Sequence, residues 1–189
     1  MANPEVACRG PRHSDIADLL ELMSGKGVRH GLTLLPHVGE AELGAMLALS
    51  CNKRWIVAVS GNSVVGYATL EWGEGRWRRS GRLGMAVADG CVRQGVGASL
   101  VTDVLELGFL NLDLQRIELE VYADNAAACA LYERMGFHYE GLKQRVSYRD
   151  GAYVDGYAMA ILNPAAFVEH IRAPRSLAEI IRAPCDEAG

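Results

Sequence analysis

Two glycines at the start of a predicted helix are the first residues of this chain whose type and spacing indicate chemistry. Gly95 and Gly97 follow Arg93 and Gln94, a pair without an acidic side chain. The first amides of a helix have no partners inside the helix and lie at the positive end of its dipole. Glycine lets an anion approach this backbone closely. The loop therefore predicts a phosphate cradle, although a glycine before a helix also occurs in plain turns.

The segments around this loop have the periods of a strand, a helix and a second strand. Residues 83–88 are predicted as a strand, and apolar residues from 96 to 110 recur at steps of three and four, as on one face of a helix. Apolar and polar side chains alternate over 116–122, which predicts a strand with Glu118 and Glu120 on its polar face. A strand, a helix and a strand in succession usually make the two strands parallel neighbours.

The rest of the chain completes a mixed α/β pattern. The glycine-rich residues 25–37 have no period, so we expect an exposed, mobile loop there. Asp124 or Asn125 is expected to cap a helix that ends at Gly136. The other expected elements are strands at 5–9, 55–59, 64–72, 137–148 and 152–162, helices at 15–23 and 40–49, and one or two short helices in the tail at 164–189.

Composition excludes several classes of function. The 189 residues suit one domain, 50% of them are hydrophobic, and the net charge of −4 provides no basic field for nucleic acid. No apolar run is long enough to span a membrane, and the N-terminus does not resemble a signal peptide. The five cysteines are scattered, which favours reduced thiols in the cytoplasm, and the histidines are dispersed, so we expect no metal.

The order of elements and two motifs resemble the GCN5-related N-acetyltransferases (the GNAT family). The segment from Gln94 to Gly97 is similar to the pyrophosphate loop of that family, and the segment from Asn125 through Tyr132 to Phe137 is similar to its second cofactor motif. The hairpin from Tyr148 to Met159 resembles the bacterial branch that acetylates free amino acids and other amines. The resemblance covers about 5–162. It implies an acyl-CoA N-acyltransferase domain at 1–163, with a mixed sheet of six or seven strands and four helices, and a C-terminal extension at 164–189 packed on it or partly mobile.

This resemblance implies acetyl-CoA as cofactor. The pyrophosphate would lie on the amides at the helix start, and the pantetheine would lie between the splayed strands 83–88 and 116–122 and bond to the backbone around Val87. The family usually has arginine or glutamine at the place of Val92, and the adjacent Arg93 is available to supply the charge. Asn125 also suits a plain helix cap. The cofactor-binding residues that the resemblance implies are Ala86, Val87, Ala88, Arg93, Gln94, Gly95, Val96, Gly97, Ala98, Asn125 and Tyr132.

The implied reaction is direct attack of a primary amine on the thioester. The amine must lose a proton, the oxyanion needs a donor such as the amide near Val87, and the leaving thiolate should gain a proton. The resemblance implies Tyr132 as the acid. It implies Glu120 as the base, with Glu118 or a water chain as substitutes. The alternative for both glutamates is a solvent-facing strand residue paired with Arg116 or Arg134.

The acceptor is expected to be a small-molecule amine, most simply a free L-amino acid. Loop 29–37 and hairpin 145–157 should form its walls, and an arginine there would suit a carboxylate. The candidate acceptor-binding residues are His37, Glu118, Arg145, Tyr148 and Tyr157, each of which also suits plain surface or strand packing.

Other readings stay open at this point. A ribosomal-protein N-terminus, a polyamine, or no catalysis at all in an acyl-CoA-binding module of the same fold are alternatives. A dinucleotide oxidoreductase fits poorly, because Leu100 occupies the third glycine slot and antiparallel hairpins precede the loop. Many relatives pair, so we expect a homodimer.

Overall fold

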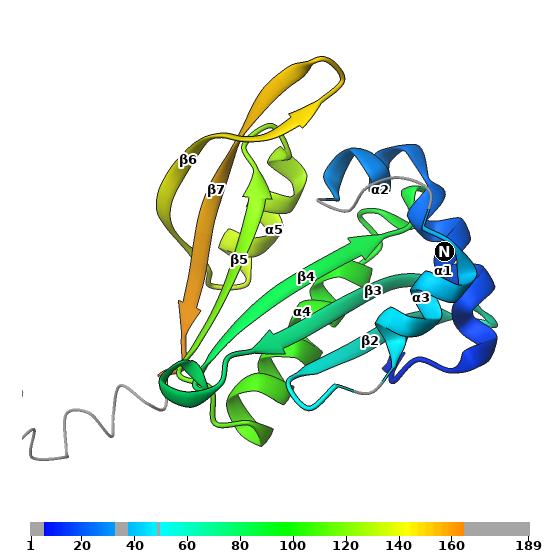
Figure 1. Ribbon diagram of the computed structural model, residues 1–189, viewed down its shortest axis with the longest axis horizontal. Coiled ribbons are helices and arrows are strands. Elements are labelled where there is room, and N and C mark those ends of the chain that lie inside the picture. Colours follow the sequence, from blue (N-terminus) through cyan, green and yellow to red (C-terminus); the bar gives the residue numbers. More distant parts are fainter. Residues whose placement is uncertain (1–5, 33–37, 49, 165–189) are drawn as a thin grey trace, which may run out of the picture.

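The computed structural model describes residues 6–32, 38–48 and 50–164 (Figure 1). Within these ranges the chain forms one seven-stranded sheet and five α-helices, which confirms the predicted mixed α/β fold. The strands are β1 (Val6–Arg9), β2 (Lys53–Ser60), β3 (Ser63–Trp72), β4 (Ser80–Val87), β5 (Arg116–Tyr122), β6 (His138–Arg149) and β7 (Ala152–Leu162). The helices are α1 (Ile16–Ser24), α2 (Lys26–Gly31), α3 (Glu40–Leu47), α4 (Val96–Glu106) and α5 (Ala126–Arg134).

The sheet has the strand order β1-β2-β3-β4-β5-β7-β6. Strands β1 to β4 form an antiparallel meander, and β5 joins it as a parallel neighbour of β4, as the strand–helix–strand pattern predicts. Strand β7 lies antiparallel between β5 and the edge strand β6. Among the strands that the structure describes, the one parallel pair is therefore the pair that α4 connects.

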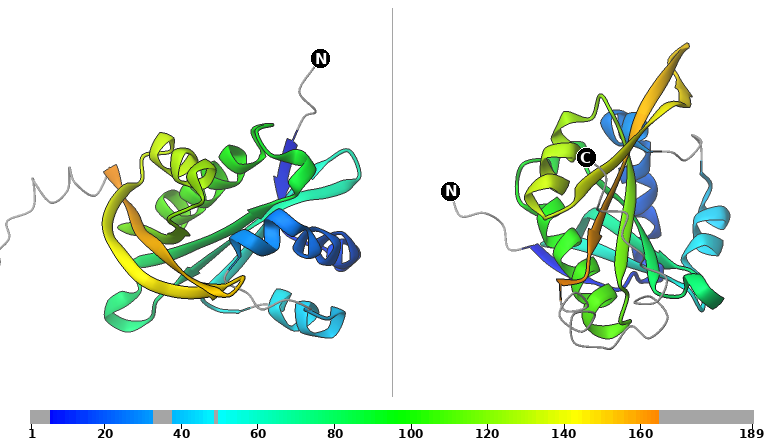
Figure 2. Two further views of the ribbon diagram at one scale, coloured as in Figure 1. Left: turned by 90° about the horizontal axis from the view of Figure 1, so that it is seen from above. Right: turned by 90° about the vertical axis from the view of Figure 1, so that its left-hand side faces the viewer.

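Helices cover the two faces unequally (Figure 2). Helices α4 and α5 lie on one face, where they pack on a core that includes Leu100, Ile117 and Phe137. Helices α1, α2 and α3 lie on the other face, over the meander, around a second core that includes Leu19 and Leu43. The alternation of β5 explains the first core: its apolar residues point to α4 and α5, and its glutamates point to the opposite face.

One predicted loop is partly helical. The expectation of an exposed, mobile loop at 25–37 is wrong for Lys26–Gly31, which forms the short helix α2 with Val28 buried against the second core. This helix is the addition to the four that the resemblance implies. His37 and the tail from residue 165 lie outside the described residues, so the predicted extension at 164–189 stays a prediction.

Burial of α4 gives a direct test of the first core. Leu100 is fully buried between α4 and the sheet, whereas Leu110 is 76% exposed just beyond the helix. We expect Leu100→Ala to lower the free energy of unfolding by about 2–5 kcal/mol, because it removes packed methyl groups and leaves a cavity. Leu110→Ala should change it by less than about 0.5 kcal/mol. Urea denaturation followed by circular dichroism measures both, and similar losses would contradict this packing.

Candidate active site

The sheet opens between its two parallel strands. Strands β4 and β5 pair over only three residue pairs, Ser80 with Arg116, Gly81 with Ile117, and Arg82 with Glu118. Beyond them β4 continues to Val87 and β5 to Tyr122 along diverging paths (Figure 1). Backbone amides and carbonyls along an open strand edge can bond to an extended ligand. The predicted splay is therefore present, and it begins at Arg82.

The loop between β4 and α4 has the backbone of an anion site. Arg93 and Gly95 have φ angles of 61° and 88°, both in the left-handed region, and α4 begins directly afterwards at Val96. Left-handed residues beside right-handed ones turn successive amides to one side, and the helix start adds its free amides. Gln94 stabilises this loop, because its Nε2 donates to the carbonyl of Gly90 at 2.9 Å.

Gly97 has a second, structural use. An added Cβ would lie 2.9 Å from Cδ2 of Leu131 and 3.3 Å from the terminal methyl of Met85. The missing side chain therefore lets α4 lie close to α5 as well as exposing backbone. Sequence reasoning considered only the second effect.

Helix α5 carries the two residues of the second motif. Oδ1 of Asn125 accepts a hydrogen bond from the amide of Ala128 at 3.1 Å, so Asn125 is the N-cap. Tyr132 is 7% exposed, and its ring centroid lies 5.7 Å from that of Phe137. Burial raises the pKa of Tyr132 above its ordinary value. The phenol is therefore protonated at neutral pH and can donate a hydrogen bond.

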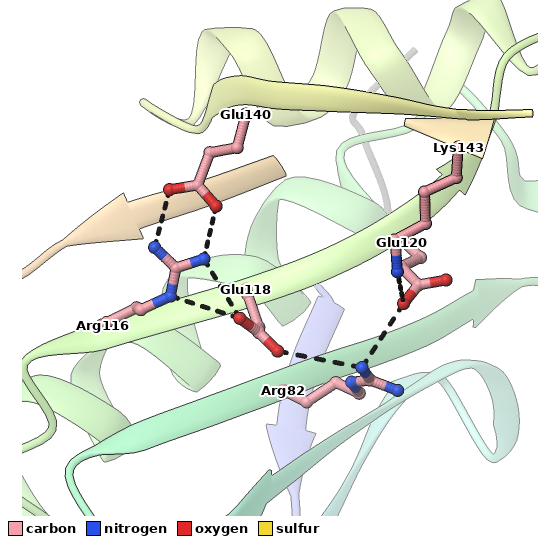
Figure 3. A network of polar contacts seen from close by, with 6 residues as sticks. All are labelled: Arg82, Arg116, Glu118, Glu120, Glu140 and Lys143. Atoms are coloured by element: carbon pink, nitrogen blue, oxygen red, sulfur yellow. Dashed lines mark hydrogen bonds and ion pairs between the residues drawn. The ribbon is translucent and has the colours of Figure 1, made fainter. Parts of the chain in front are cut away.

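Glu118 and Glu120 belong to a chain of charges across β4, β5 and β6, on the face opposite α5 (Figure 3). Glu118 accepts from Arg116 at 3.1 Å, which confirms one of the two pairings considered from the sequence. Oε1 of Glu120 lies 2.5 Å from Nζ of Lys143 and 3.4 Å from NH2 of Arg82. Glu120 thus lies beside the opening of the strands, with a cation on each side.

The far end of this charge network lies at Glu140. Both of its carboxylate oxygens accept hydrogen bonds from Arg116, and this contact holds the pKa of Glu140 below its ordinary value. Exposed pairs of this kind stabilise a fold only weakly. Their main effect here is on geometry, because they fix which way the guanidinium of Arg116 and the carboxylate of Glu118 point.

The predicted acceptor residues of the hairpin do not all lie together. Tyr157 pairs across the strands with Val121, whose side chain belongs to the core under α5, and its ring packs edge-on against Tyr139 at 4.9 Å. It therefore lies on the face away from Glu118 and Glu120. Tyr148 is 66% exposed and packs against Tyr153, and the guanidinium of Arg145 lies 5.9 Å from that same ring.

Arg149 lies where sequence reasoning expected only a turn. Its guanidinium is 4.8 Å from the ring of Tyr122, donates to the carbonyl of His30 at 2.6 Å, and pairs with Asp124. Its side chain is 14% exposed. Arg149 is the last residue of β6, one residue beyond the strand that the sequence predicts at 137–148.

The end of α2 and the tip of the hairpin enclose a hollow of about 420 Å³. His30, Asp124 and Arg149 line it, together with the hairpin carboxylates Asp150 and Asp155. His30 at the end of α2 and residues of the hairpin therefore line one hollow, and both segments are ones that the sequence assigns to the acceptor side as a prediction. Charges of both signs line this hollow.

Among residues 6–32, 38–48 and 50–164, histidine, cysteine and carboxylate side chains form no cluster of three suited to a metal ion. In the same ranges, none of the helices has both the length and the apolar character needed to cross a bilayer.

The comparisons with known proteins identify the family of this chain. The profile of the Acetyltransferase (GNAT) family matches residues 29–137, more than half of the 189 residues. The chain therefore belongs to the GNAT family of N-acetyltransferases. The match contains the opened strand pair, the loop before α4 and all of α5.

Individual relatives differ in their acceptors. The chain is 30% identical to the L-amino acid N-acetyltransferase AaaT of Escherichia coli over 158 residues. The aligned residues are 82% of this chain and 97% of AaaT. A spermidine N-acetyltransferase of Vibrio cholerae, solved with CoA and spermine, has a TM-score of 0.76 at 23% identity over 84% of this chain and 95% of its own. YncA of Salmonella typhimurium, a putative acetyltransferase solved with acetyl-CoA, has a TM-score of 0.75 at 18% identity. The match covers 84% of this chain and 94% of YncA.

Asn125 allows its structural role to be separated from a role toward the cofactor. We expect Asn125→Ala to lower the free energy of unfolding by about 1 kcal/mol, because the amide of Ala128 loses its acceptor. Asn125→Asp keeps the carbonyl-type acceptor and should retain stability, but it lacks the side-chain N–H donors. Chemical denaturation measures the free energy of unfolding of each variant, and titration with coenzyme A measures its affinity for the cofactor. Equal stability of the alanine variant and the wild type would show that the cap contributes nothing.

Proposed function

We propose that this protein transfers the acetyl group of acetyl-CoA to the primary amine of a free L-amino acid. One observation carries the cofactor side of the proposal: β4 and β5 separate at Arg82, next to a loop with two left-handed residues at the start of α4. The acceptor side is supported by the relative AaaT, which matches over nearly its whole length.

The described backbone fits the shape of coenzyme A. The amides of residues 93–98 would hold the pyrophosphate, since they combine a turn with left-handed residues and the free amides of a helix start. Along the open edge of β4 the backbone of Val87 would bond to the pantetheine, and Ala86 and Ala88 flank it as proposed contacts, although the amide of Ala88 itself donates to the carbonyl of Val65 on β3. Acetyl-CoA supplies the activated acyl group, a thioester whose carbonyl carbon accepts the amine.

Three groups of this chain would handle the protons and charge of the transfer. The amide of Val87 would donate to the developing oxyanion. Tyr132 would give its proton to the leaving sulfur as the carbon–sulfur bond breaks, because burial keeps its hydroxyl protonated. Glu120 would accept a proton from the incoming ammonium, directly or through a water. Lys143 and Arg82 hold its carboxylate in place until then.

An amino-acid acceptor also suits the charges of the acceptor side. A free amino acid carries an ammonium and a carboxylate, and the hollow is lined by carboxylates and Arg149, with Arg145 over the ring of Tyr153, which also lines it. Arginine can contact a carboxylate through two parallel hydrogen bonds. His37, Glu118 and Tyr148 remain proposed contacts of the acceptor, whereas Tyr157 lies on the face away from Glu118 and Glu120 and is left out of this set.

A polyamine is the second candidate acceptor. Net charge of −4 and the hollow with Asp124, Asp150 and Asp155 favour a cation. The spermidine N-acetyltransferase shares the fold at a TM-score of 0.76, although 23% identity supports the fold alone.

A panel of acceptors distinguishes these proposals. Release of the free thiol of CoA should be measured with L-amino acids, polyamines and peptides with free N-termini. We expect turnover with one or more L-amino acids and little with the other classes. Turnover with spermidine alone would favour the polyamine. Binding of acetyl-CoA without thiol release from any amine would indicate a non-catalytic acyl-CoA-binding module.

Tyr132 is tested by removing one oxygen atom. We expect Tyr132→Phe to lower kcat by about 10-fold or more, because the leaving sulfur loses its proton donor. Acetyl-CoA affinity and folding should be nearly unchanged, since the ring and its contact with Phe137 remain. Steady-state kinetics and a binding titration provide the two readouts, and an unchanged kcat would remove Tyr132 from the mechanism.

Glu120 has a matched control within its own network. We expect Glu120→Gln to lower kcat/KM by about 10-fold or more and to abolish the acidic limb of the pH–rate profile, because the amide cannot accept a proton. Glu140→Gln removes a carboxylate from the other end of the same network, away from the strand opening. It should retain the wild-type pH profile. Identical behaviour of the two variants would assign Glu120 a purely structural role.

A further inference from the structure

Helix α2 is held at both ends by residues that are distant in the sequence. Its N-terminus contacts the loop between β4 and α4, and its C-terminus contacts β5 and the β6–β7 hairpin. The first of these belongs to the proposed cofactor site, and the second to the proposed acceptor wall. The helix therefore connects the two halves of the active site.

Asp89 makes the contact at the N-terminus. Its Oδ2 accepts from the amide of Gly27 at 2.9 Å, and its Oδ1 accepts from the amide of Val28 at 3.0 Å. Both amides lie in the first turn of α2, where a helix has no internal partners for them and where its dipole favours a negative charge. Because α2 has no side-chain cap of its own, a carboxylate 62 residues away performs that task.

The fit between Asp89 and the helix is close. A Cβ on Gly27 would lie 2.5 Å from Oδ1 of Asp89, a distance at which the carboxylate would have to move. Glycine at this position is otherwise unfavourable in a helix by about 1 kcal/mol relative to alanine. Glycine at position 27 thus lowers helix propensity but leaves room for the carboxylate of Asp89.

At the other end, two main-chain carbonyls of the helix terminus are bound. Arg149 donates to the carbonyl of His30 at 2.6 Å, and the hydroxyl of Tyr122 lies 3.4 Å from the carbonyl of Leu32. The guanidinium of Arg149 also lies over the Tyr122 ring. A cation at a helix C-terminus is favourable. The position of α2 therefore determines where one wall of the acceptor side lies relative to the hairpin.

Because Asp89 is charged, the strength of its contact with α2 should depend on whether the cofactor is bound. Asp89 begins the turn that leads to Arg93, and Gln94 ties the same turn to the proposed cradle through the carbonyl of Gly90. A free carboxylate beside a bound diphosphate would be repelled, whereas one bound to two helix amides is largely compensated. A diphosphate in the cradle should thus favour the state in which α2 is docked on Asp89.

We infer that Asp89 is a positioning residue that couples cofactor binding to the placement of α2, and so to the formation of the acceptor wall. This inference rests on the proposed function for the position of the diphosphate. Linkage requires that a ligand which favours the docked state also be favoured by it. Weakening the contact should therefore reduce the effect of coenzyme A on α2.

Hydrogen–deuterium exchange with coenzyme A alone tests the coupling without any acceptor. In the wild type we expect coenzyme A to slow exchange in 93–98 and also in 26–31. In Asp89→Asn, which removes the charge and one acceptor oxygen, slowing at 93–98 should persist, while slowing at 26–31 should fall by about 5-fold or more.

A second pair of variants changes residues of the helices instead of Asp89. Gly27→Ala should displace Asp89 and give the same loss of slowing at 26–31, although alanine by itself favours a helix. Gly44→Ala in α3 is the control, because an added Cβ there has no atom within 4 Å. It should behave as the wild type. Thermal melting confirms that each variant is folded, and Gly27→Ala keeps the test decisive if Asp89→Asn does not fold.

The outcomes separate this inference from the proposed function. Slowing at 93–98 without slowing at 26–31 in the wild type would overturn the coupling and leave the cofactor site standing. Undiminished slowing at 26–31 in Asp89→Asn would also overturn it. Absence of slowing in both segments would refute the cofactor site, and the coupling with it.

Steady-state kinetics distinguish a positioning role from a purely structural one, because only a positioning role is expected to change the acceptor KM without changing kcat. With the best acceptor of the panel, Asp89→Asn should raise the acceptor KM by about 5-fold or more and leave kcat within about 2-fold. A uniform fall in kcat with both KM values unchanged would indicate general damage and contradict a positioning role.

Discussion

The early end of the pairing between β4 and β5 is the constraint on which the site depends. From Ser80 to Arg82 the two strands pair, and Gly81 leaves room there for the core side chains of Leu114 and Leu70, which would lie 2.7 Å and 2.9 Å from an added Cβ. Beyond Arg82 the described residues of β4 and β5 no longer pair, so the sheet divides into two arms. Helix α4 covers the meander arm, and α5 covers the arm of β5, β7 and β6. The opening exists because each arm has its own helix to bury its apolar face.

The same division explains the charges at the opening. Arg82 is the last residue of β4 that pairs with β5, and its guanidinium lies between Glu118 and Glu120. Each exposed ion pair adds little stability by itself. The network instead sets which carboxylate faces the opening and which faces Arg116. A structural role for Glu118 and a chemical role for Glu120 are compatible on one strand face, because the two share Arg82 but Glu118 also pairs with Arg116 and Glu120 with Lys143.

Elements with a strong internal pattern were predictable, and elements made by distant contacts were not. Strand β5 was predicted to the residue, because apolar and polar side chains alternate along all of it. Helix α2 was missed, because its six residues include Gly27 and Gly31 and bury only Val28, so they have no period. The charge that caps it comes from Asp89, and no local reading of 25–37 can contain that residue. Tertiary contacts decided the structure there.

The site divides in the same way. The loop before α4 and the cap of α5 are local devices, and their glycines and Asn125 could be recognised in the sequence. The acceptor wall depends on how three segments meet. The hairpin is also irregular: Arg145 has a φ of 53°, and the register of β6 against β7 shifts between Lys143 and Ser147. Simple alternation along β6 therefore could not show that Arg149 faces α2.

This difference between the two sides accounts for the pattern of relatives. A cofactor held mainly by backbone amides requires only the opened strands and a helix start, and many sequences can fold to those. An acceptor held by side chains from α2, β5 and the hairpin requires particular residues on three segments. A structure at 23% identity can therefore share the fold while its name gives spermidine, although the relative AaaT is named for L-amino acids. We therefore expect the acceptor specificity of this chain to depend on α2 and the hairpin, where Arg149 of the hairpin contacts His30 of α2, and not on the cofactor loop.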